Sequence, residues 1–151
     1  MPISRRTFVR ASLVSTTLGA FAARSVNAAL PAAVFDAPNP TAAIRAAMGS
    51  TEAVADDRVR LNIPDRVENG DVVPVSVTAD FGNVQRIALV ADKNPMPVIA
   101  VFRLTPAVEG FIATRIRLAE TCNVMALAES GGKLLTVNKP VQVMIGGCGS
   151  D

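Results

Sequence analysis

The stretch CNVMALAESGGKLLTVNKPVQVMI, residues 122–145, decides the fold of this chain. Apolar residues recur at every second position over 122–128, which is the period of a β-strand. Ser130–Lys133 contains two adjacent glycines and has the form of a tight turn between antiparallel strands. A further alternating stretch covers Leu135–Ile145. The sequence therefore predicts a β-hairpin over this region.

The same alternation recurs upstream, between segments that favour turns. It covers five stretches, 58–63, 73–77, 86–91, 98–104 and 112–118. Asn69-Gly70 and the prolines of Asp92–Pro97 mark turns, and Pro74 indicates an edge position or a strand start. About seven short strands at intervals of roughly 8–12 residues predict an all-β fold. We expect an Ig-like antiparallel β-sandwich over residues 58–145.

Residues 29–57 are predicted to lead into this sandwich and to contain its one short helix. Asn39-Pro40 offers a helix N-cap followed by proline at the first helical position, and Gly49 offers a stop signal. We therefore expect a helix over Thr41–Met48. Ala29–Phe35 is predicted to be extended, and Ser50–Asp57 to be a loop.

Residues 1–28 have the pattern of a twin-arginine (Tat) export signal. Arg5-Arg6 precedes a mildly apolar stretch that is weaker than the ~20 strongly apolar residues of a membrane span. Val26-Asn27-Ala28 supplies a small-residue cleavage site, so we expect cleavage after Ala28. The mature protein is then expected in the periplasm, without a membrane span. The alternative, an amphipathic helix of a cytosolic protein, leaves the order of these features unexplained.

The composition of the mature chain excludes several classes of function. Four of the 15 basic residues and none of the 13 acidic residues fall within the signal, which leaves 11 basic and 13 acidic residues. This balance argues against a nucleic-acid partner. The sequence has no histidine, so it lacks Ser-His-Asp triads, Cys-His pairs and imidazole metal sites. Two cysteines cannot form a four-sulfur zinc site. We expect no metal, no cofactor and no catalysis by this chain alone.

The predicted sandwich is followed by a glycine-rich tail, residues 146–151, that contains Cys148. Gly146, Gly147 and Gly149 give the backbone free dihedrals and no bulk, and the tail can extend on the order of 20 Å. No cation beside Cys148 lowers the pKa of its thiol from about 8.5, so activation must come from another protein. The tail therefore predicts a covalent attachment site at Cys148. The alternative is an incidental cysteine in a frayed terminus.

Cys122 has a different setting, at the start of a predicted strand and in register with Val124. This position predicts a small buried thiol that packs as a hydrophobe. A disulfide between Cys122 and Cys148 is an alternative, and it would make the protein a thiol–disulfide redox protein. A third interpretation is a structural Ig-like module with an incidental cysteine.

Several segments together resemble the SoxY family, the sulfur-carrier subunits of the periplasmic thiosulfate-oxidising (Sox) system. Two of them, Ala91–Pro97 followed by Val101–Leu104, are similar to the central motif of that family, and Thr114–Ala119 is similar to a second motif. Gly146–Gly149 is similar to the family's end motif, and it follows these segments behind a twin-arginine signal. The sequence departs from the family pattern at Ser150-Asp151, where a second glycine is typical, and at Cys122.

The resemblance implies that Cys148 is the attachment point for sulfur intermediates. It implies a heterodimer with a SoxZ-like subunit and three further partners. The c-type cytochrome SoxXA would couple thiosulfate to the thiol, the hydrolase SoxB would release sulfate to leave a cysteine persulfide, and the sulfane dehydrogenase SoxCD would act on the remaining sulfur. Asp92–Pro97 and Thr114–Ala119 are equally compatible with a turn, a solvated strand face or an interface, and we assign them no site role.

Overall fold

The predicted hairpin lies at the centre of the larger of two sheets. The computed structural model describes residues 32–144. Within this range β8 (Cys122–Ser130) pairs antiparallel with β9 (Lys133–Val143), and Ser130 lies opposite Lys133. Gly131 and Gly132 form the turn with φ of 56° and 76°, a conformation that favours glycine. The hairpin prediction is confirmed, except that Ile145 lies outside the described residues.

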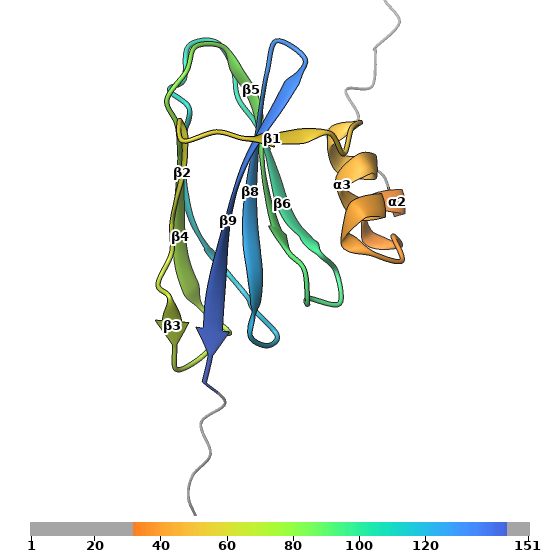
Figure 1. Ribbon diagram of the computed structural model, residues 1–151, viewed down its shortest axis with the longest axis vertical. Coiled ribbons are helices and arrows are strands. Elements are labelled where there is room, and N and C mark those ends of the chain that lie inside the picture. Colours follow the sequence, from red (N-terminus) through yellow and green to blue (C-terminus); the bar gives the residue numbers. More distant parts are fainter. Residues whose placement is uncertain (1–31, 145–151) are drawn as a thin grey trace, which may run out of the picture.

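The two sheets pack face to face as a sandwich (Figure 1). The larger sheet has the order β1-β9-β8-β5-β6, with β3 also paired to β9, and the smaller sheet has the order β2-β4-β7. The remaining strands are β1 (Ala53–Ala55), β2 (Val59–Asn62), β3 (Arg66–Val67), β4 (Val73–Ala79), β5 (Val84–Ala91), β6 (Val98–Arg103) and β7 (Phe111–Ile116). The prediction of an Ig-like β-sandwich is confirmed.

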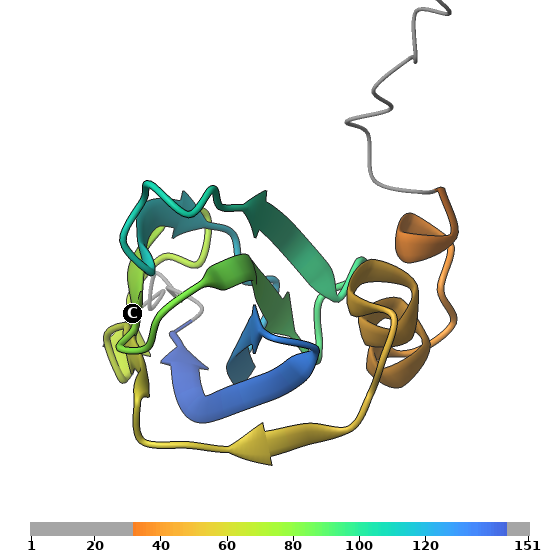
Figure 2. The same ribbon diagram turned by 90° about the horizontal axis from the view of Figure 1, so that it is seen from above.

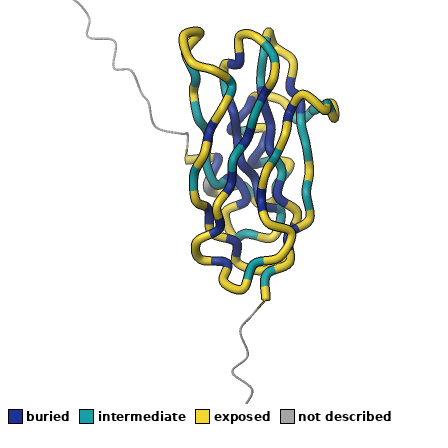
Figure 3. Tube along the Cα trace, turned by 90° about the vertical axis from the view of Figure 1, so that its left-hand side faces the viewer, coloured by how far each residue is buried: buried dark blue, intermediate teal, exposed yellow. Residues whose placement is uncertain are grey.

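The core lies between the sheets and consists of alternate residues of the facing strands (Figure 3). Val73, Val75 and Val77 of β4 are all buried there, as the period of two predicts. β5 differs because both of its faces are covered. Ile87 and Leu89 belong to the core between the sheets, whereas its intervening residues contact the helical layer.

The short helix α3 (Pro40–Met48) covers part of the outer face of the larger sheet (Figure 2). Asn39 caps it, since its side chain accepts a hydrogen bond from the Ala42 amide at 2.9 Å. Gly49 ends it in the left-handed conformation with φ of 79°. The predicted helix over Thr41–Met48 is therefore confirmed, beginning one residue earlier.

Two predictions for the segment before the sandwich were wrong. Residues 32–35 of the expected extended lead-in form a single helical turn, α2 (Ala32–Phe35), because Val34 is buried in the same cluster as α3. The expected loop over Ser50–Asp57 contains β1, which pairs in parallel with β9. Three residues are too few to show a period, and this partner lies about 80 residues away in sequence.

The parallel pairings of β1 and β3 with β9 bring the described strands to nine, two more than the sequence indicates.

Pro74 lies near the start of β4, as the sequence predicts. β4 is the central strand of its sheet, but β2 pairs only with Ser76–Ala79. Pro74 therefore lies at the strand start and has only β7 beside it, so its missing amide hydrogen removes no ladder bond to β2.

Candidate functional site

The predicted attachment site lies beyond the part of the chain that the structure describes. Cys148, together with Gly146, Gly147 and Gly149, falls within residues 145–151, and the export signal falls within residues 1–31; both lie outside the described range. The structure does describe the strand end that precedes the tail. The amide of Val143 donates to Thr121 Oγ1 at 3.0 Å, and that of Met144 donates to the Val67 carbonyl at 2.8 Å. The chain is thus held on both sides up to Met144.

Met144 lies at one end of the sandwich, which we call the Met144 end and define by residues 68–72, 92–97, 117–121 and Met144. It is the lower end in Figure 1. The Asn69-Gly70 turn lies here, and Asn69 Oδ1 accepts a hydrogen bond from the Asp71 amide at 2.8 Å. Gly70 is buried, and its carbonyl accepts a hydrogen bond from the Leu118 amide at 2.8 Å. A Cβ at Gly70 would overlap the Leu118 carbonyl oxygen, so this close approach requires glycine.

Two segments that received no role in the sequence analysis meet at this end. Asn94 Nδ2 donates to the Arg117 carbonyl at 2.8 Å, and Asn94 Oδ1 accepts from the Ala119 amide at 2.9 Å. The loop over Asp92–Pro97 is therefore tied to the segment that follows β7. Asp92 ties the same loop to β8, because its carboxylate accepts from the Asn123 amide at 2.9 Å and from Asn123 Nδ2 at 3.0 Å. Two Asx residues in one short loop were the only sequence signal for this arrangement.

Two shallow hollows lie on either side of Arg117. The first has a volume of about 380 Å³ and its lining includes Gly70, Asp71, Val143 and Met144. The second has a volume of about 400 Å³ and is lined mainly by apolar side chains, those of Pro95, Met96, Val98 and Ile99. Arg117 and Ala119 line both hollows, so the two adjoin each other across this segment.

The charges at the Met144 end are exposed and only loosely paired. Arg117 Nε lies 3.2 Å from Asp71 Oδ1, and their side chains are 78% and 62% exposed. An ion pair this exposed contributes little to stability, so the guanidinium can exchange Asp71 for another anion at small cost. Met96 and Met144 add large apolar side chains that are 55% and 49% exposed.

Cys122 is 5% exposed and packs in the core between the sheets, which confirms its prediction as a buried thiol. Burial raises the pKa of this thiol, and the nearby carboxylates of Asp92 and Glu120 raise it further. A thiolate at Cys122 is therefore disfavoured at neutral pH. Within residues 32–144 it is a free thiol, and it lies opposite Val141 in the strand that leads to the tail.

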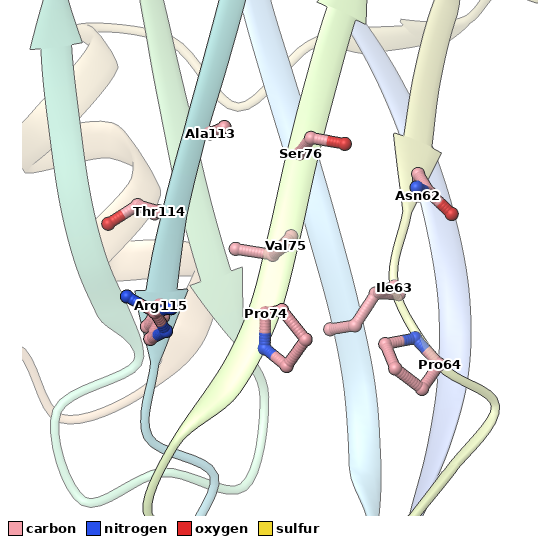
Figure 4. A pocket seen from close by; sticks show the side chains of 9 residues that line it. All are labelled: Asn62, Ile63, Pro64, Pro74, Val75, Ser76, Ala113, Thr114 and Arg115. Atoms are coloured by element: carbon pink, nitrogen blue, oxygen red, sulfur yellow. The ribbon is translucent and has the colours of Figure 1, made fainter.

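A third and larger hollow lies elsewhere, on the outer face of the smaller sheet (Figure 4). It measures about 850 Å³, and small side chains such as Ser76 and Ala113 line it together with Pro64 and Pro74. Arg115 is the one charged residue in its lining, and no carboxylate or thiol faces it there. This surface holds no pair of groups for acid–base or nucleophilic chemistry.

Residues 32–144 have neither a cluster of metal ligands nor a membrane-spanning helix. This range contains no group of three or more His, Cys, Asp or Glu side chains that could hold a metal ion. None of its helices is both long enough and apolar enough to span a membrane.

Comparison with known proteins relates the whole sandwich to one family. Residues 44–148 match the family of the sulfur oxidation protein SoxY. The fold is similar to the structure of the sulfur carrier protein SoxY from Chlorobium limicola f thiosulfatophilum, with a TM-score of 0.64 and 29% sequence identity. That similarity covers 72% of this chain and 95% of that chain. No curated protein matches the sequence significantly. Because the family match runs from α3 through the sandwich to Cys148, this chain belongs to the SoxY family.

Proposed function

We propose that this chain is a covalent carrier of sulfur intermediates in thiosulfate and sulfur oxidation, and that the intermediate is attached to the thiol of Cys148. The observation that carries the proposal is the extent of the family match, which ends at Cys148 itself. The similar structure from Chlorobium limicola f thiosulfatophilum is that of a sulfur carrier protein. The hydrogen bonds that hold β9 up to Met144 support the same proposal, because they give the following segment a fixed base.

The proposed chemistry begins at the Cys148 thiol and balances as two steps. The thiol and thiosulfate join to form Cys–S–S–SO₃⁻, which releases one proton and two electrons to a c-type cytochrome of the SoxXA kind. Water then cleaves the bond between the sulfane sulfur and the sulfonate. A SoxB-type hydrolase would catalyse this step and release sulfate and a proton, which leaves the persulfide Cys–S–SH. A SoxCD-type dehydrogenase would act on that remaining sulfur.

In this proposal the chain itself is not an enzyme. The sequence has no histidine, and the hollows at the Met144 end place no general base beside a nucleophile. The partner enzymes must therefore supply the activated pocket. We also propose that the protein works in the periplasm after Tat export and that it pairs with a SoxZ-like subunit.

The alternative function, a thiol–disulfide redox protein that uses Cys122 and Cys148, is less well supported. Cys122 is buried, and its pKa is raised by that burial. A redox cysteine needs thiolate character and access to its partner. Cys122 would gain both only if the end of β8 opened.

The test is intact-mass spectrometry of the protein purified from its native periplasm, before and after reductant, followed by peptide mapping. We expect a reductant-removable sulfur or thiosulfonate adduct on the Cys148 peptide. Cys148→Ser should abolish both the adduct and the thiosulfate-dependent activity of the reconstituted system, whereas the matched variant Cys122→Ser should retain both. Equal loss in the two variants, with a mass two hydrogens short in the native protein, would support the redox alternative and refute the carrier proposal.

A further inference from the structure

We propose that Thr121 is a positioning residue that keeps Cys122 covered, and that it thereby prevents this cysteine from removing the sulfur carried on Cys148. The inference rests on the proposed function, because it takes Cys148 to bear a sulfur cargo. Cys122 is a departure from the family pattern, and it places a second thiol in the strand pair that leads to the tail. A sulfur carrier with two thiols has to keep the second one away from its cargo.

The reaction to be prevented is thiol–disulfide exchange between the two cysteines, and it needs no further reactant. The Cys122 thiol would lose its proton and attack Sγ of a Cys148 that carries Cys–S–S–SO₃⁻. A Cys122–Cys148 disulfide would form, the bond between Sγ and the next sulfur would break, and thiosulfate would leave with the electron pair of that bond. Cys122 is oxidised and the departing sulfur is reduced. A persulfide would react in the same way and release hydrosulfide, so either cargo would be lost and Cys148 blocked.

Distance alone does not keep the two thiols apart. Cys122 lies opposite Val141, which precedes Met144 by three residues, or about 10 Å of extended strand. Cys148 follows Met144 by four residues, which can span about 13–14 Å. The segment is therefore long enough to return to the level of Cys122. The two thiols are separated by burial instead, since Cys122 is 5% exposed and Val141 is fully buried.

Thr121 fixes the strand end that provides this cover. The ladder between β8 and β9 ends at the pair of Cys122 and Val141, so no residue of β8 pairs with Val143. The Thr121 hydroxyl takes the place of a strand there. Its Oγ1 accepts a hydrogen bond from the Val143 amide at 3.0 Å and donates one to the Val143 carbonyl at 3.4 Å. The opposite edge of β9 is held by the backbone of β3. Without the hydroxyl, hydrogen bonds would fix the end of β9 on one edge only.

The reactivity of Cys122 depends on how often this strand end opens. Burial raises the pKa of its thiol, and the carboxylates of Asp92 and Glu120 raise it further, so the covered thiol rarely ionises at neutral pH. Opening would remove the burial and expose the sulfur. The rate of exchange should therefore follow the population of the open state. Loss of the hydrogen bonding by Thr121 should increase that population about 2- to 10-fold.

The experiment loads the reduced mature chain with tetrathionate, which converts a thiol to Cys–S–S–SO₃⁻ and releases thiosulfate and a proton. Excess reagent is removed, peptide mapping verifies that the adduct is on Cys148, and intact mass follows its conversion to the disulfide. We expect the wild type to retain the adduct. Thr121→Val has a similar shape but no hydroxyl, and it should form the Cys122–Cys148 disulfide about 2- to 10-fold faster. Adding Cys122→Ser to Thr121→Val should restore the lifetime of the adduct.

Two further variants separate the position of Thr121 from its effect on stability. Thr121→Ser keeps the hydroxyl and should behave like the wild type. Thr136→Val is the matched control, because Thr136 Oγ1 donates to the Ala126 carbonyl at 3.1 Å in the same strand pair, away from the strand end. It should lower the urea midpoint as Thr121→Val does, yet retain the adduct.

Equal adduct lifetimes in the wild type and Thr121→Val would overturn the proposal. So would a loss of adduct that persists after Cys122 is replaced, or exchange that is equally fast in Thr136→Val or in Thr121→Ser. A chain that follows the expected pattern in these assays but never carries an adduct in the periplasm would refute the proposed function and leave the role of Thr121 intact.

Discussion

The two ends of the sandwich are closed in different ways, although each depends on a glycine. We call the opposite end the Gly131 end and define it by residues 80–83, 104–110 and 130–133. Gly70 at the Met144 end and Gly110 at the Gly131 end occupy equivalent places, one at each end of the pairing between β4 and β7. At both sites a Cβ would overlap a backbone carbonyl, that of Leu118 or that of Ala79.

The two ends differ in the hydrogen bonds that side chains form with distant backbone groups. At the Met144 end, the side chains of Asp92, Asn94 and Thr121 each form a hydrogen bond with a backbone amide or carbonyl group. In every case that group lies at least 22 residues away in sequence. At the Gly131 end the tight turn of Gly131-Gly132 closes one hairpin locally, and Ser130 adds a single bond to the Gly82 carbonyl at 2.9 Å. The comparison indicates that side-chain hydrogen bonds fix the conformation of the loops at the Met144 end. At the Gly131 end the tight turn mainly connects two neighbouring strands.

The largest effect that would test this comparison is expected at the glycines. Gly70→Ala should lower the free energy of unfolding by ~3 kcal/mol, because the new Cβ must displace the Leu118 carbonyl. This loss is the upper end of the range that overpacked sites typically show. Gly110→Ala should cost a similar amount at the other end. Urea unfolding measures both.

Gly82→Ala is the control for these two variants, because a Cβ there meets no atom within 4 Å. It should leave the unfolding midpoint unchanged within error. If Gly70→Ala were equally harmless, the close approach to Leu118 would not be needed for the fold, and the equivalence of the two ends would be lost.

A smaller effect is expected from the side-chain bonds that distinguish the ends. Asn94→Ala removes two hydrogen bonds and leaves the Arg117 carbonyl and the Ala119 amide without that partner, so it should cost about 1–2 kcal/mol. Ser130→Ala removes one bond at the Gly131 end and should cost less, about 0.5–1 kcal/mol. The two free energies of unfolding can be compared directly by urea titration. Equal losses of stability in the two variants would show that the Met144 end is no more specialised than the Gly131 end.

The smallest effect is expected from an ion pair just before β2, formed by Asp56 and Arg58. Arg58 contacts the Gly131 end, because its carbonyl accepts a hydrogen bond from the Asp80 amide and its guanidinium lies over the Phe81 ring. Arg58 lowers the pKa of the Asp56 carboxyl from 3.8 to about 2, mainly through side-chain and backbone hydrogen bonds. A lowered folded-state pKa stabilises the protein above the ordinary value and loses that contribution as the pH falls from about 3.8 to about 2. Asp56→Asn should remove this pH dependence, and the resulting change in stability should be small because the Arg58 side chain is 59% exposed.

Thermal unfolding between pH 2 and pH 5 measures this difference. A steep loss in the wild type that Asp56→Asn abolishes would assign the pair a larger role than its exposure permits.

Much of the fold and one part of the site could be predicted from the sequence. The alternation of Val73, Val75 and Val77, the Gly131-Gly132 turn and the Asn39–Gly49 helix boundaries are local signals, and each was confirmed. The burial of Cys122 followed from its register with Val124. The helical turn α2 and the strands β1 and β3 were missed because contacts with distant residues create them.

The sequence by itself determined the period of the strands, the caps and turns, and the presence of a cysteine in a glycine-rich segment, because each depends on neighbours within a few residues. Only the tertiary structure decided that Asn94 meets Arg117 and Ala119, that two hollows adjoin beside Met144, and that Gly70 must lack a side chain. The physical reason is that strand pairing joins residues that are far apart along the chain, and no local pattern encodes which loops will share an end of the sandwich.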